Sequence, residues 1–595
     1  LQGNGSELSF KEITIKGGAA TEGGCIGTVE GTLTDISLHN INITARGKYI
    51  GGLAGLARGA MTNVTLTGDL TYDADSGTTT YGSNIINEGN YIGTGGLVGI
   101  GSGAFEKLKV SGTHVKGYEY VGGVSGYEND NTNLEIEVGE KTPKTADGTE
   151  VPFSVFVEGR NWISGVAGRG SISDSSTTMN FFQNVKVQKA RISASGTMAA
   201  GIGGYTVRVE DSEVFGCDIY AASSYASGSS GSWSNTYRTT VRDTKISSGR
   251  YVGGITAYAS HMYDCTVTGS TITGSEYVGG ALGWSYNSRV NSTGVTDSVI
   301  GADSAQYVGG LIGGSYEDSS TFTYAHAFNS FSKDSTVTAA SAAGGIIGYA
   351  KGGIFENNYS NATVIANEHA GGFAGLAEGY IMNSGAGRRL QIDGFYFRGT
   401  VKANLENAGA LFGTYDHGAQ PRNSDGTFYL DEIVPTKINA DTVKTDDSIV
   451  DAGKVYIQKI ILAPEAEAVT AGVPASAAKV ANLKVSSNPD MSQSEIGTDA
   501  GTIPNLYLWD GFNKDKQSRL GSEDVTSEKL GDESFYQSIG FSSNYWNYMG
   551  LSETGMTDAA IVPQEKGTLQ LNVGTDADGG LADGSYTAEV STNNY

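Results

Sequence analysis

A short glycine-rich motif recurs along most of this chain and constrains the fold more than any other feature. The motif runs bulky residue, small apolar residue, Gly-Gly, aliphatic residue, small residue, as in Tyr251-VGGITAY and Tyr277-VGGALGW. Further copies begin at Tyr49, Tyr91, Tyr120, Trp162, Tyr307, Ala342, His369 and Asn407. The spacing between copies varies while the motif is kept, which indicates loops of different length on a constant scaffold.

Each repeat has the pattern of short strands. Between Tyr251 and Tyr277 there are three short alternating runs, separated by Ser, Gly, Asn or Asp, and none has room for an ordinary helix. Three strands per repeat, stacked on copies of themselves, predict an all-β fold, a right-handed parallel β-helix (solenoid). The Gly pair lacks Cβ atoms at one level of every coil, which lets the wall bend or approach the opposite wall. A loose Gly-rich linker is disfavoured, because linkers do not keep an aliphatic residue on both sides of each pair.

The composition divides the chain into four parts. Residues 1–48 are expected to form entry or cap coils, residues 49–415 the body of the solenoid, and residues 416–554 a non-repetitive region that packs on it and caps it. Residues 555–595 are expected to form a hairpin-like tail. The last coil needs a cap because it otherwise leaves an open edge. The predicted capping residues are Phe535, Tyr536, Phe541, Trp546 and Leu551.

Composition and charge exclude several classes of protein. Among 595 residues there are 87 Gly but only 9 Pro, without a G-X-Y period, which excludes collagen; 38% hydrophobic residues are too many for a disordered chain. A net charge of -25 repels phosphate and anionic lipid, so nucleic acid is not an expected partner. No apolar run is long enough to span a membrane. Because Leu1 is not an initiator Met, we expect a trimmed secreted segment, extracellular or attached to a cell wall.

Several kinds of catalytic or metal site are absent from the sequence. Three Cys give neither a disulfide framework nor a metal-binding pair, and none of the six His lies in H-E-x-x-H. No phosphate-binding GxxxxGK[ST] occurs. The acidic run near residues 576–584 lacks the spacing of an EF-hand, which favours a turn. No metal site is therefore predicted, and a structural Ca²⁺ stays an open alternative.

Carboxylates and aromatic residues remain, and glycan chemistry needs both. A retaining glycosidase holds two carboxyl groups about 5–5.5 Å apart, and equivalent positions in adjacent coils of a β-helix lie about one strand spacing apart. Alignment of the repeats puts Asp218 and Asp243 on one ladder, and Asp211 and Asp264 on another. Asp in such turns also commonly hydrogen-bonds backbone, so a purely structural role is the alternative.

The densest acidic cluster of the repeat region comprises Glu210, Asp211, Glu213 and Asp218. Repulsion between these carboxylates is expected to raise the pKa of one member, as a general acid requires. The segment 221–237 reads as a long insertion that forms one wall of a cleft. The predicted substrate-binding residues are Trp233, Tyr237, Asp243, Tyr258, Asp264 and Trp284, with Tyr286 as a further aromatic face.

Two family resemblances follow from these patterns. The repeat resembles the GLUG repeat (near V-G-G-L-V-G-Y) of Gram-positive surface proteins, including regions that precede the catalytic domain of zinc metallopeptidases. The size and architecture are also similar to the lacto-N-biosidases of glycoside hydrolase family 136, retaining enzymes of gut bacteria. That family uses two Asp seven positions apart, and within residues 1–415 only Asp211 and Asp218 match. The resemblance implies that Asp218 is the nucleophile and Asp211 the acid/base.

The sequence therefore predicts a secreted glycosidase that acts on an oligosaccharide or glycoprotein glycan of milk or mucin type, as a monomer. The alternative is a non-catalytic adhesin or glycan-binding region of a surface protein. A third alternative is a calcium-dependent polysaccharide lyase, for which Arg208, Arg238 and Arg242 would have to form a basic groove. Whether a helper protein is needed for folding stays open.

Overall fold

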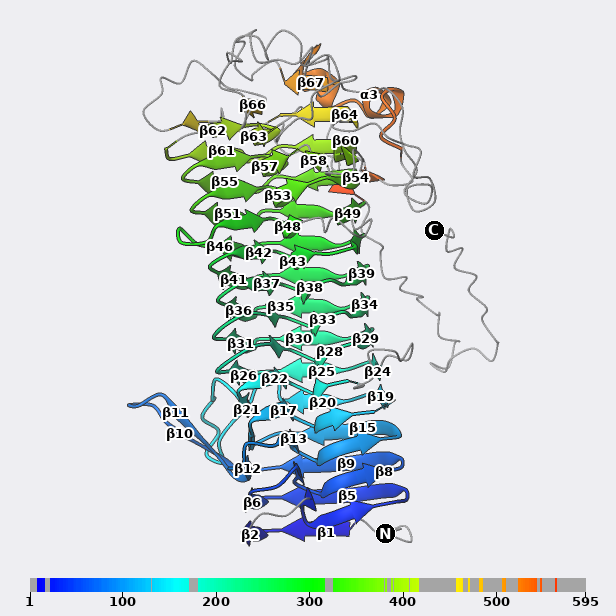
Figure 1. Ribbon diagram of the computed structural model, residues 1–595, viewed down its shortest axis with the longest axis vertical. Coiled ribbons are helices and arrows are strands. Elements are labelled where there is room, and N and C mark those ends of the chain that lie inside the picture. Colours follow the sequence, from blue (N-terminus) through cyan, green and yellow to red (C-terminus); the bar gives the residue numbers. More distant parts are fainter. Residues whose placement is uncertain are drawn as a thin grey trace, which may run out of the picture. The chain divides into compact units, whose positions relative to one another are not determined.

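The computed structural model describes residues 8–416 except 17–21, 130, 171–179, 316–324, 379, 382–386, 389 and 406. Beyond residue 416 it describes 456–463, 469–470, 481–484, 506–509, 523–542, 546–547 and 562–563. These residues are almost entirely short strands that pair in parallel from coil to coil (Figure 1). The predicted parallel β-helix is confirmed.

Four parallel sheets run along the stack, and we name them A to D. Among the described residues they contain 23, 14, 13 and 14 strands. One coil consists of β34 (Asn235–Tyr237) and β35 (Thr240–Arg242) in sheet A, followed by one strand in each of the other sheets. These are β36 (Lys245–Ser248) in sheet B, β37 (Tyr251–Gly253) in sheet C and β38 (Thr256–Tyr258) in sheet D. A coil thus has five short strands, and the prediction of three was wrong.

Left-handed residues divide the coil more finely than the alternation pattern does. The residue between β34 and β35 is Arg238, with φ 46°, and the next turn holds Asp243, with φ 51°. Equivalent positions hold Asp211 and Asp264 in neighbouring coils. One residue in this conformation bends the chain between two strands, and Asn and Asp tolerate it better than most residues. The scattered Asp residues therefore mark corners of the coil.

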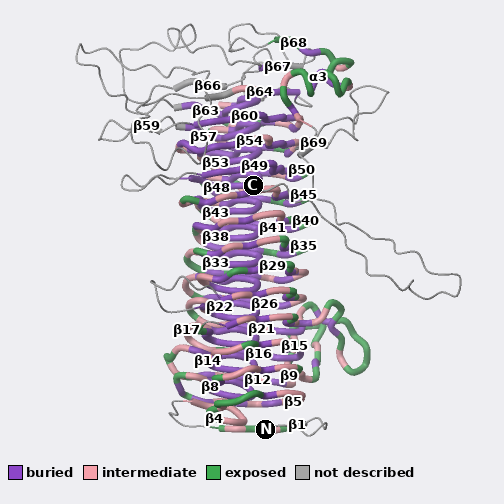
Figure 2. The backbone as a smooth tube through the Cα atoms, turned by 90° about the vertical axis from the view of Figure 1, so that its right-hand side faces the viewer, coloured by how far each residue is buried: buried purple, intermediate pink, exposed green. Residues whose placement is uncertain are grey.

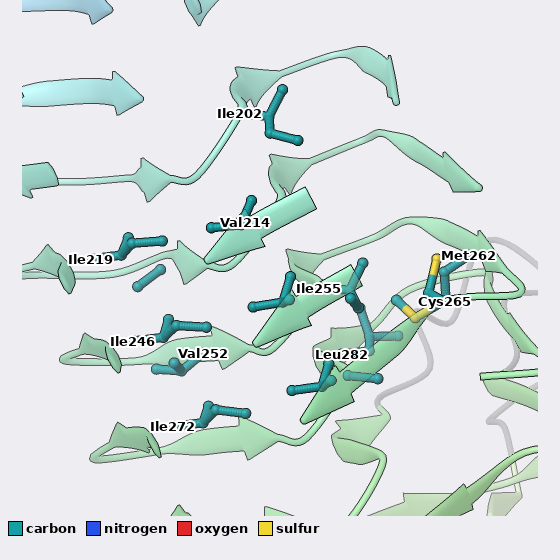
Figure 3. Close-up of a cluster of buried hydrophobic side chains, with 14 of the residues drawn as sticks. Ile202, Val214, Ile219, Ile246, Val252, Ile255, Met262, Cys265, Ile272 and Leu282 are labelled. Carbon is teal, nitrogen blue, oxygen red and sulfur yellow. The ribbon is translucent and has the colours of Figure 1, made fainter. Parts of the chain in front are cut away.

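Aliphatic side chains fill the interior as ladders that run from coil to coil. Ile219, Ile246 and Ile272 are register partners in sheet B, and each is essentially fully buried (Figure 3). Burying each such side chain contributes roughly 1.5–3 kcal/mol. Cys217 and Cys265 lie in the same core, where burial raises the pKa of both thiols to about 12. They act as small apolar residues, as expected.

The Gly pair of the motif lies where sheets C and D of one coil fold against each other. A Cβ atom on Gly253 would lie 1.9 Å from the carbonyl oxygen of Thr256, and one on Gly254 would lie 2.0 Å from that of Gly280. Both distances are too short for a real Cβ contact, so a side chain at either position would require the backbone to shift. The Gly pair thus lies at a tight bend of the wall and at a close contact with the next coil.

Two copies of the motif were not identified from the sequence. β32 (Ala226–Ser227) and β33 (Ser230–Ser232) hold the ladder positions of β37 and β38, although Ala and Ser replace the usual residues. The same is true of β27 (Ala199–Ala200). Residues 221–237 are therefore an ordinary part of a coil. The expected insertion that walls a cleft is not there.

The solenoid extends beyond the predicted body at both ends. β1 (Leu8–Lys11) pairs with β5 (Leu33–His39), so the entry segment already forms a coil. After residue 416, β64 (Tyr456–Leu462) and β67 (Leu506–Trp509) extend sheet A. The hairpin of β10 (Leu70–Asp73) and β11 (Thr78–Tyr81) projects from the stack, with mostly exposed residues (Figure 2).

A small second core holds the predicted cap. The helices α2 (Ser527–Leu530) and α3 (Glu533–Ser538) bury Phe535 and Tyr536, and Phe541 and Trp546 are buried beside them. Their partners include Tyr359 and Tyr396, which are register partners in sheet A. This segment therefore covers the side of sheet A over successive coils. Leu551 and, apart from 562–563, the tail 555–595 lie outside the described residues.

Candidate functional site

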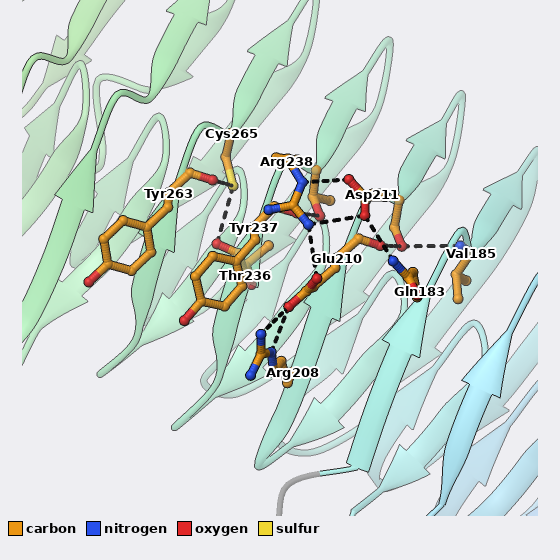
Figure 4. A network of polar contacts seen from close by, with 12 residues as sticks. Gln183, Val185, Arg208, Glu210, Asp211, Thr236, Tyr237, Arg238, Tyr263 and Cys265 are labelled. Atoms are coloured by element: carbon orange, nitrogen blue, oxygen red, sulfur yellow. Dashed lines mark hydrogen bonds and ion pairs between the residues drawn. The ribbon is translucent and has the colours of Figure 1, made fainter. Parts of the chain in front are cut away.

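Three of the four members of the predicted acidic cluster, Glu210, Asp211 and Glu213, lie on sheet A, where arginines neutralise them. Arg238 Nε lies 2.6 Å from Asp211 Oδ1, and its Nη2 lies 2.9 Å from Glu210 Oε2 (Figure 4). Arg208 Nε donates to the other oxygen of Glu210 at 2.6 Å, and Arg242 Nε lies 2.5 Å from Glu213 Oε1. The cluster is thus an alternating network of charges.

This network reverses the expected electrostatics of Asp211. Hydrogen bonding to Arg238, with a further bond from Gln183 Nε2 at 3.1 Å, lowers the pKa of Asp211. A general acid at neutral pH needs a raised pKa, so the lowered pKa of Asp211 does not suit the acid/base role that the family resemblance implies for it. Arg238, one of the three arginines considered for a lyase groove, is the main cause of the lowered pKa of Asp211.

Asp218 lies in a different sheet from Asp211. Asp218 is the first residue of β31 (Asp218–Ala221) in sheet B. The preceding strand, β30 (Glu213–Phe215), belongs to sheet A, so a corner of the coil separates Asp218 from the rest of the cluster. Its ladder neighbours are Arg191 on one side and Lys245 on the other. The register partners of Asp218 in the two adjacent coils are therefore cations and not carboxylates.

The predicted pairing of Asp218 with Asp243 is wrong by two residues. Arg242 is the register partner of Phe215, so Asp243 follows in the corner position that Gly216 holds in the coil before. The alignment had matched Asp with Asp. The structure instead matches Cys217 with Thr244, whose hydroxyl accepts from Cys217 N at 3.4 Å. The buried residue after the corner sets the register.

Asp211 and Asp264 do share a ladder, as predicted. Arg238 occupies the coil between them, because Tyr237 pairs with Glu210 on one side and with Tyr263 on the other. The predicted binding residue Tyr237 lies beside this network and stacks on Tyr263 with ring centroids 5.2 Å apart. Arg208 lies 5.2 Å from the Tyr237 ring, so Tyr237 belongs to the charged network of sheet A.

Three other predicted binding residues belong to a different surface. Trp233, Tyr258 and Trp284 lie along the outer corner of sheets C and D, together with aromatic residues from neighbouring coils. We call this surface the aromatic strip. Its members are Tyr225, Tyr251, Tyr277 and Tyr307 on sheet C, Tyr258, Trp284 and Tyr349 on sheet D, and Trp233 and Tyr286 beside them.

The sheet C members form a continuous ladder of rings. The centroids of successive rings from Tyr225 to Tyr307 are 5.2, 5.7 and 5.1 Å apart, with interplanar angles of 24°, 16° and 19°. Trp284 packs edge-on against Tyr277 at 4.2 Å. Each contact of this kind contributes roughly 0.5–1.5 kcal/mol beyond its buried area. The ladder is therefore a rigid surface fixed by the coil spacing.

Trp233 is the most exposed member of the strip. It is 44% exposed, although its ring packs edge-on against Tyr258 at 6.0 Å and Tyr286 at 5.7 Å. Burial raises the pKa of Tyr258 to about 12, so its hydroxyl stays protonated and can donate a hydrogen bond. An exposed indole beside protonated phenols offers both an apolar face and polar edges.

The strip continues toward the N-terminus around Arg169. Tyr120, Trp162 and Met198 precede Tyr225 on the same ladder of sheet C, and Arg169 and Tyr205 precede Tyr258 on the ladder of sheet D. The Arg169 guanidinium lies 5.1–5.6 Å from the rings of Tyr120, Trp162 and Tyr205. Four members of the strip, Trp233, Tyr258, Trp284 and Tyr286, were identified from the sequence. The rest could have been found from the bulky first residue of each motif, which is Tyr or Trp in most copies.

The described part of the chain provides no cluster of three or more His, Cys, Asp or Glu arranged to hold a metal ion. Nor does any helix in it combine the length and apolarity needed to cross a bilayer. In comparisons with known proteins, no family model, no curated protein and no solved structure matches this chain.

Proposed function

We propose that this chain is an extracellular glycan-binding solenoid whose ligand lies along the aromatic strip. The observation that carries the proposal is the run of aromatic rings on consecutive coils, with the 44% exposed Trp233 at its edge. The apolar face of a sugar ring packs well on an indole, while phenol hydroxyls exchange hydrogen bonds with sugar hydroxyls.

The repeated geometry suits a chain-like ligand. Every coil adds a further ring at 5.1–5.7 Å, so contacts of one kind recur along the strip. Several weak contacts held at fixed spacing add up when the surface is pre-organised, because little side-chain entropy is lost on binding. An oligosaccharide or the glycan of a glycoprotein fits this description.

The state of the carboxylates supports binding over hydrolysis. Asp211 is ion-paired, with a lowered pKa, and Asp218 lies between Arg191 and Lys245 on another sheet. The two-carboxylate machinery of a glycosidase needs an acid and a base facing each other. The proposal also agrees with the resemblance of the repeat to GLUG repeats of bacterial surface proteins.

One assay tests the alternative, that the protein hydrolyses glycans. We expect no release of disaccharide when the protein is incubated with lacto-N-tetraose, and the same result for Asp218→Asn. Release by the wild type that is abolished in Asp218→Asn would instead establish the lacto-N-biosidase-like activity implied by the second resemblance.

Tryptophan fluorescence tests the binding proposal itself. Trp162, Trp233 and Trp284 belong to the strip or its continuation, out of five tryptophans in the chain. Titration with lacto-N-tetraose and with oligosaccharides released from mucin should change their emission in a saturable way. No saturable change, and no retention of the protein on immobilised mucin glycans, would contradict the proposal.

A further inference from the structure

The N-terminal end of the aromatic strip contains a guanidinium with an unused edge. Arg169, in β23 (Ala167–Arg169), donates from Nη1 to the Tyr120 hydroxyl at 2.7 Å. Its Nε is buried and has no hydrogen-bond acceptor. No described carboxylate lies within ion-pair distance of its guanidinium. The edge formed by Nε and Nη2 is therefore without a partner among the described residues.

This arrangement differs from that of other arginines on the same wall. Arg250, beside Tyr251, has its Nε 2.5 Å from Glu276 Oε2, and Arg58 has its Nη1 2.9 Å from Glu30 Oε1. A second arginine near Arg169, the exposed Arg160, contacts the Tyr118 hydroxyl and its ring but no described carboxylate. Neither Arg169 nor Arg160 therefore has a carboxylate partner among the described residues, although the chain carries a net charge of -25.

The chemistry of the unused edge selects its ligand. The Arg fork matches a carboxylate through two parallel hydrogen bonds. The surrounding rings of Tyr120, Trp162 and Tyr205 hold the guanidinium in place and lower the local dielectric, which strengthens such a bond. At physiological salt the other carboxylates of the chain repel an anionic ligand only within about 8 Å, because salt screens their charge at longer distances.

We propose that the Arg169 end of the aromatic strip binds the carboxylate of an acidic sugar residue, a sialic or uronic acid. The inference rests on the proposed function and adds a specificity to it. The aromatic strip holds the neutral part of the glycan, and Arg169 selects chains that carry an acidic residue. Arg169 Nη2 donates to a carboxylate oxygen while Nη1 keeps its bond to Tyr120.

The test compares one neutral and one acidic glycan of the same core. Calorimetric titrations with lacto-N-tetraose and with its sialylated form should show the sialylated glycan bound about tenfold more tightly, the effect expected of one charge-assisted pair. Arg169→Gln should remove this advantage and leave the affinity for lacto-N-tetraose unchanged. Arg169→Lys keeps the charge but not the fork and should retain only part of it. Arg58→Gln, which removes the same charge on another part of the solenoid, should change neither affinity.

The outcomes separate the inference from the proposed function. Equal affinities for both glycans in the wild type would overturn the inference and leave the function standing. Equal weakening of both by Arg169→Gln, with the unfolding midpoint lowered, would show that Arg169 only supports the strip and would also overturn it. Binding of neither glycan would count against the proposed function itself.

Discussion

Arg238 binds Asp211 and Glu210 at the same time, with Nε 2.6 Å from Asp211 Oδ1 and Nη2 2.9 Å from Glu210 Oε2. One guanidinium on one coil thus ties together two carboxylates of the preceding coil. The pair of adjacent acids that suggested catalysis in the sequence is held together by a cation one coil later. These two ion pairs link adjacent coils. They also offset the repulsion between Glu210 and Asp211 that would otherwise raise the pKa of one of them.

Replacing Arg238 by Gln should destabilise the solenoid by about 1–2 kcal/mol. Glu210 is only 10% exposed in its side chain and would lose one of its two cations, while solvent screens the more exposed Asp211. The folded-state pKa of Asp211 is lowered, so its contribution is present above its unfolded pKa and is lost as pH falls through the folded value. The difference between variant and wild type should therefore shrink in acid.

Denaturant midpoints measured at neutral and at acid pH check this expectation. Arg46→Gln, which breaks a pair with both side chains about half exposed or more, is the matched control and should cost less than about 0.5 kcal/mol. Equal effects of the two substitutions would show that the Arg238 network contributes nothing special.

Glu128 should make the solenoid less stable as pH rises. It is fully buried, accepts from Ser125 Oγ at 2.5 Å and from Asn133 Nδ2 at 2.8 Å, and burial raises its pKa from 4.5 to about 7. A raised folded-state pKa gives stability that is present below pH 4.5 and is lost as pH rises through 7. At pH 8 the neutral Glu128→Gln should be more stable by up to about 3 kcal/mol, and at pH 4 the two proteins should be nearly equal.

Unfolding midpoints between pH 4 and pH 8 measure this effect, with the exposed Glu30→Gln as control. A wild-type midpoint that does not fall between pH 5 and pH 8, or a variant that follows the wild type throughout, would mean that Glu128 is charged at little cost in the folded state.

Gly280 should be irreplaceable, whereas Gly27 should tolerate Ala. A Cβ atom on Gly280 would lie 2.1 Å from the carbonyl oxygen of Gly310 in the next coil, and one on Gly27 would have no neighbour within 4 Å. We expect Gly280→Ala to lower stability by more than about 3 kcal/mol or to abolish soluble expression. Gly27→Ala should stay within about 0.5 kcal/mol of the wild type. Similar midpoints for the two variants would contradict the account of the Gly pair.

The sequence predicted the solenoid well because its core positions are local and repetitive. Val252, Gly253 and Gly254 recur with the same neighbours in coil after coil, so one pattern identifies the inner wall and its closest approach. The number of strands was missed because single left-handed residues such as Asp243 cut the alternation without breaking it. Those corners depend on φ, which the residue type only partly reveals.

The candidate site was harder to predict because it depends on register between coils. A shift of two residues separates Asp218 from Asp243, and the pairing of Cys217 with Thr244 that fixes it involves buried residues of no chemical interest. Likewise Arg238 stands far from Asp211 in sequence but next to it in the stack. The sheet C members of the aromatic strip, such as Tyr251, Tyr277 and Tyr307, were missed for the opposite reason, because these Tyr residues looked like part of the scaffold motif.

The exposed indole of Trp233 is the most direct test of glycan binding. Trp233→Ala should weaken binding of the sialylated lacto-N-tetraose about tenfold or more and leave the unfolding midpoint nearly unchanged, since the ring is 44% exposed. Tyr220→Ala removes an aromatic ring that is 46% exposed on sheet B, outside the strip, and should leave affinity unchanged. Loss of affinity in Trp233→Ala alone is the predicted result of this calorimetric comparison. Unchanged affinity in Trp233→Ala, or equal losses in both variants, would contradict binding along the aromatic strip.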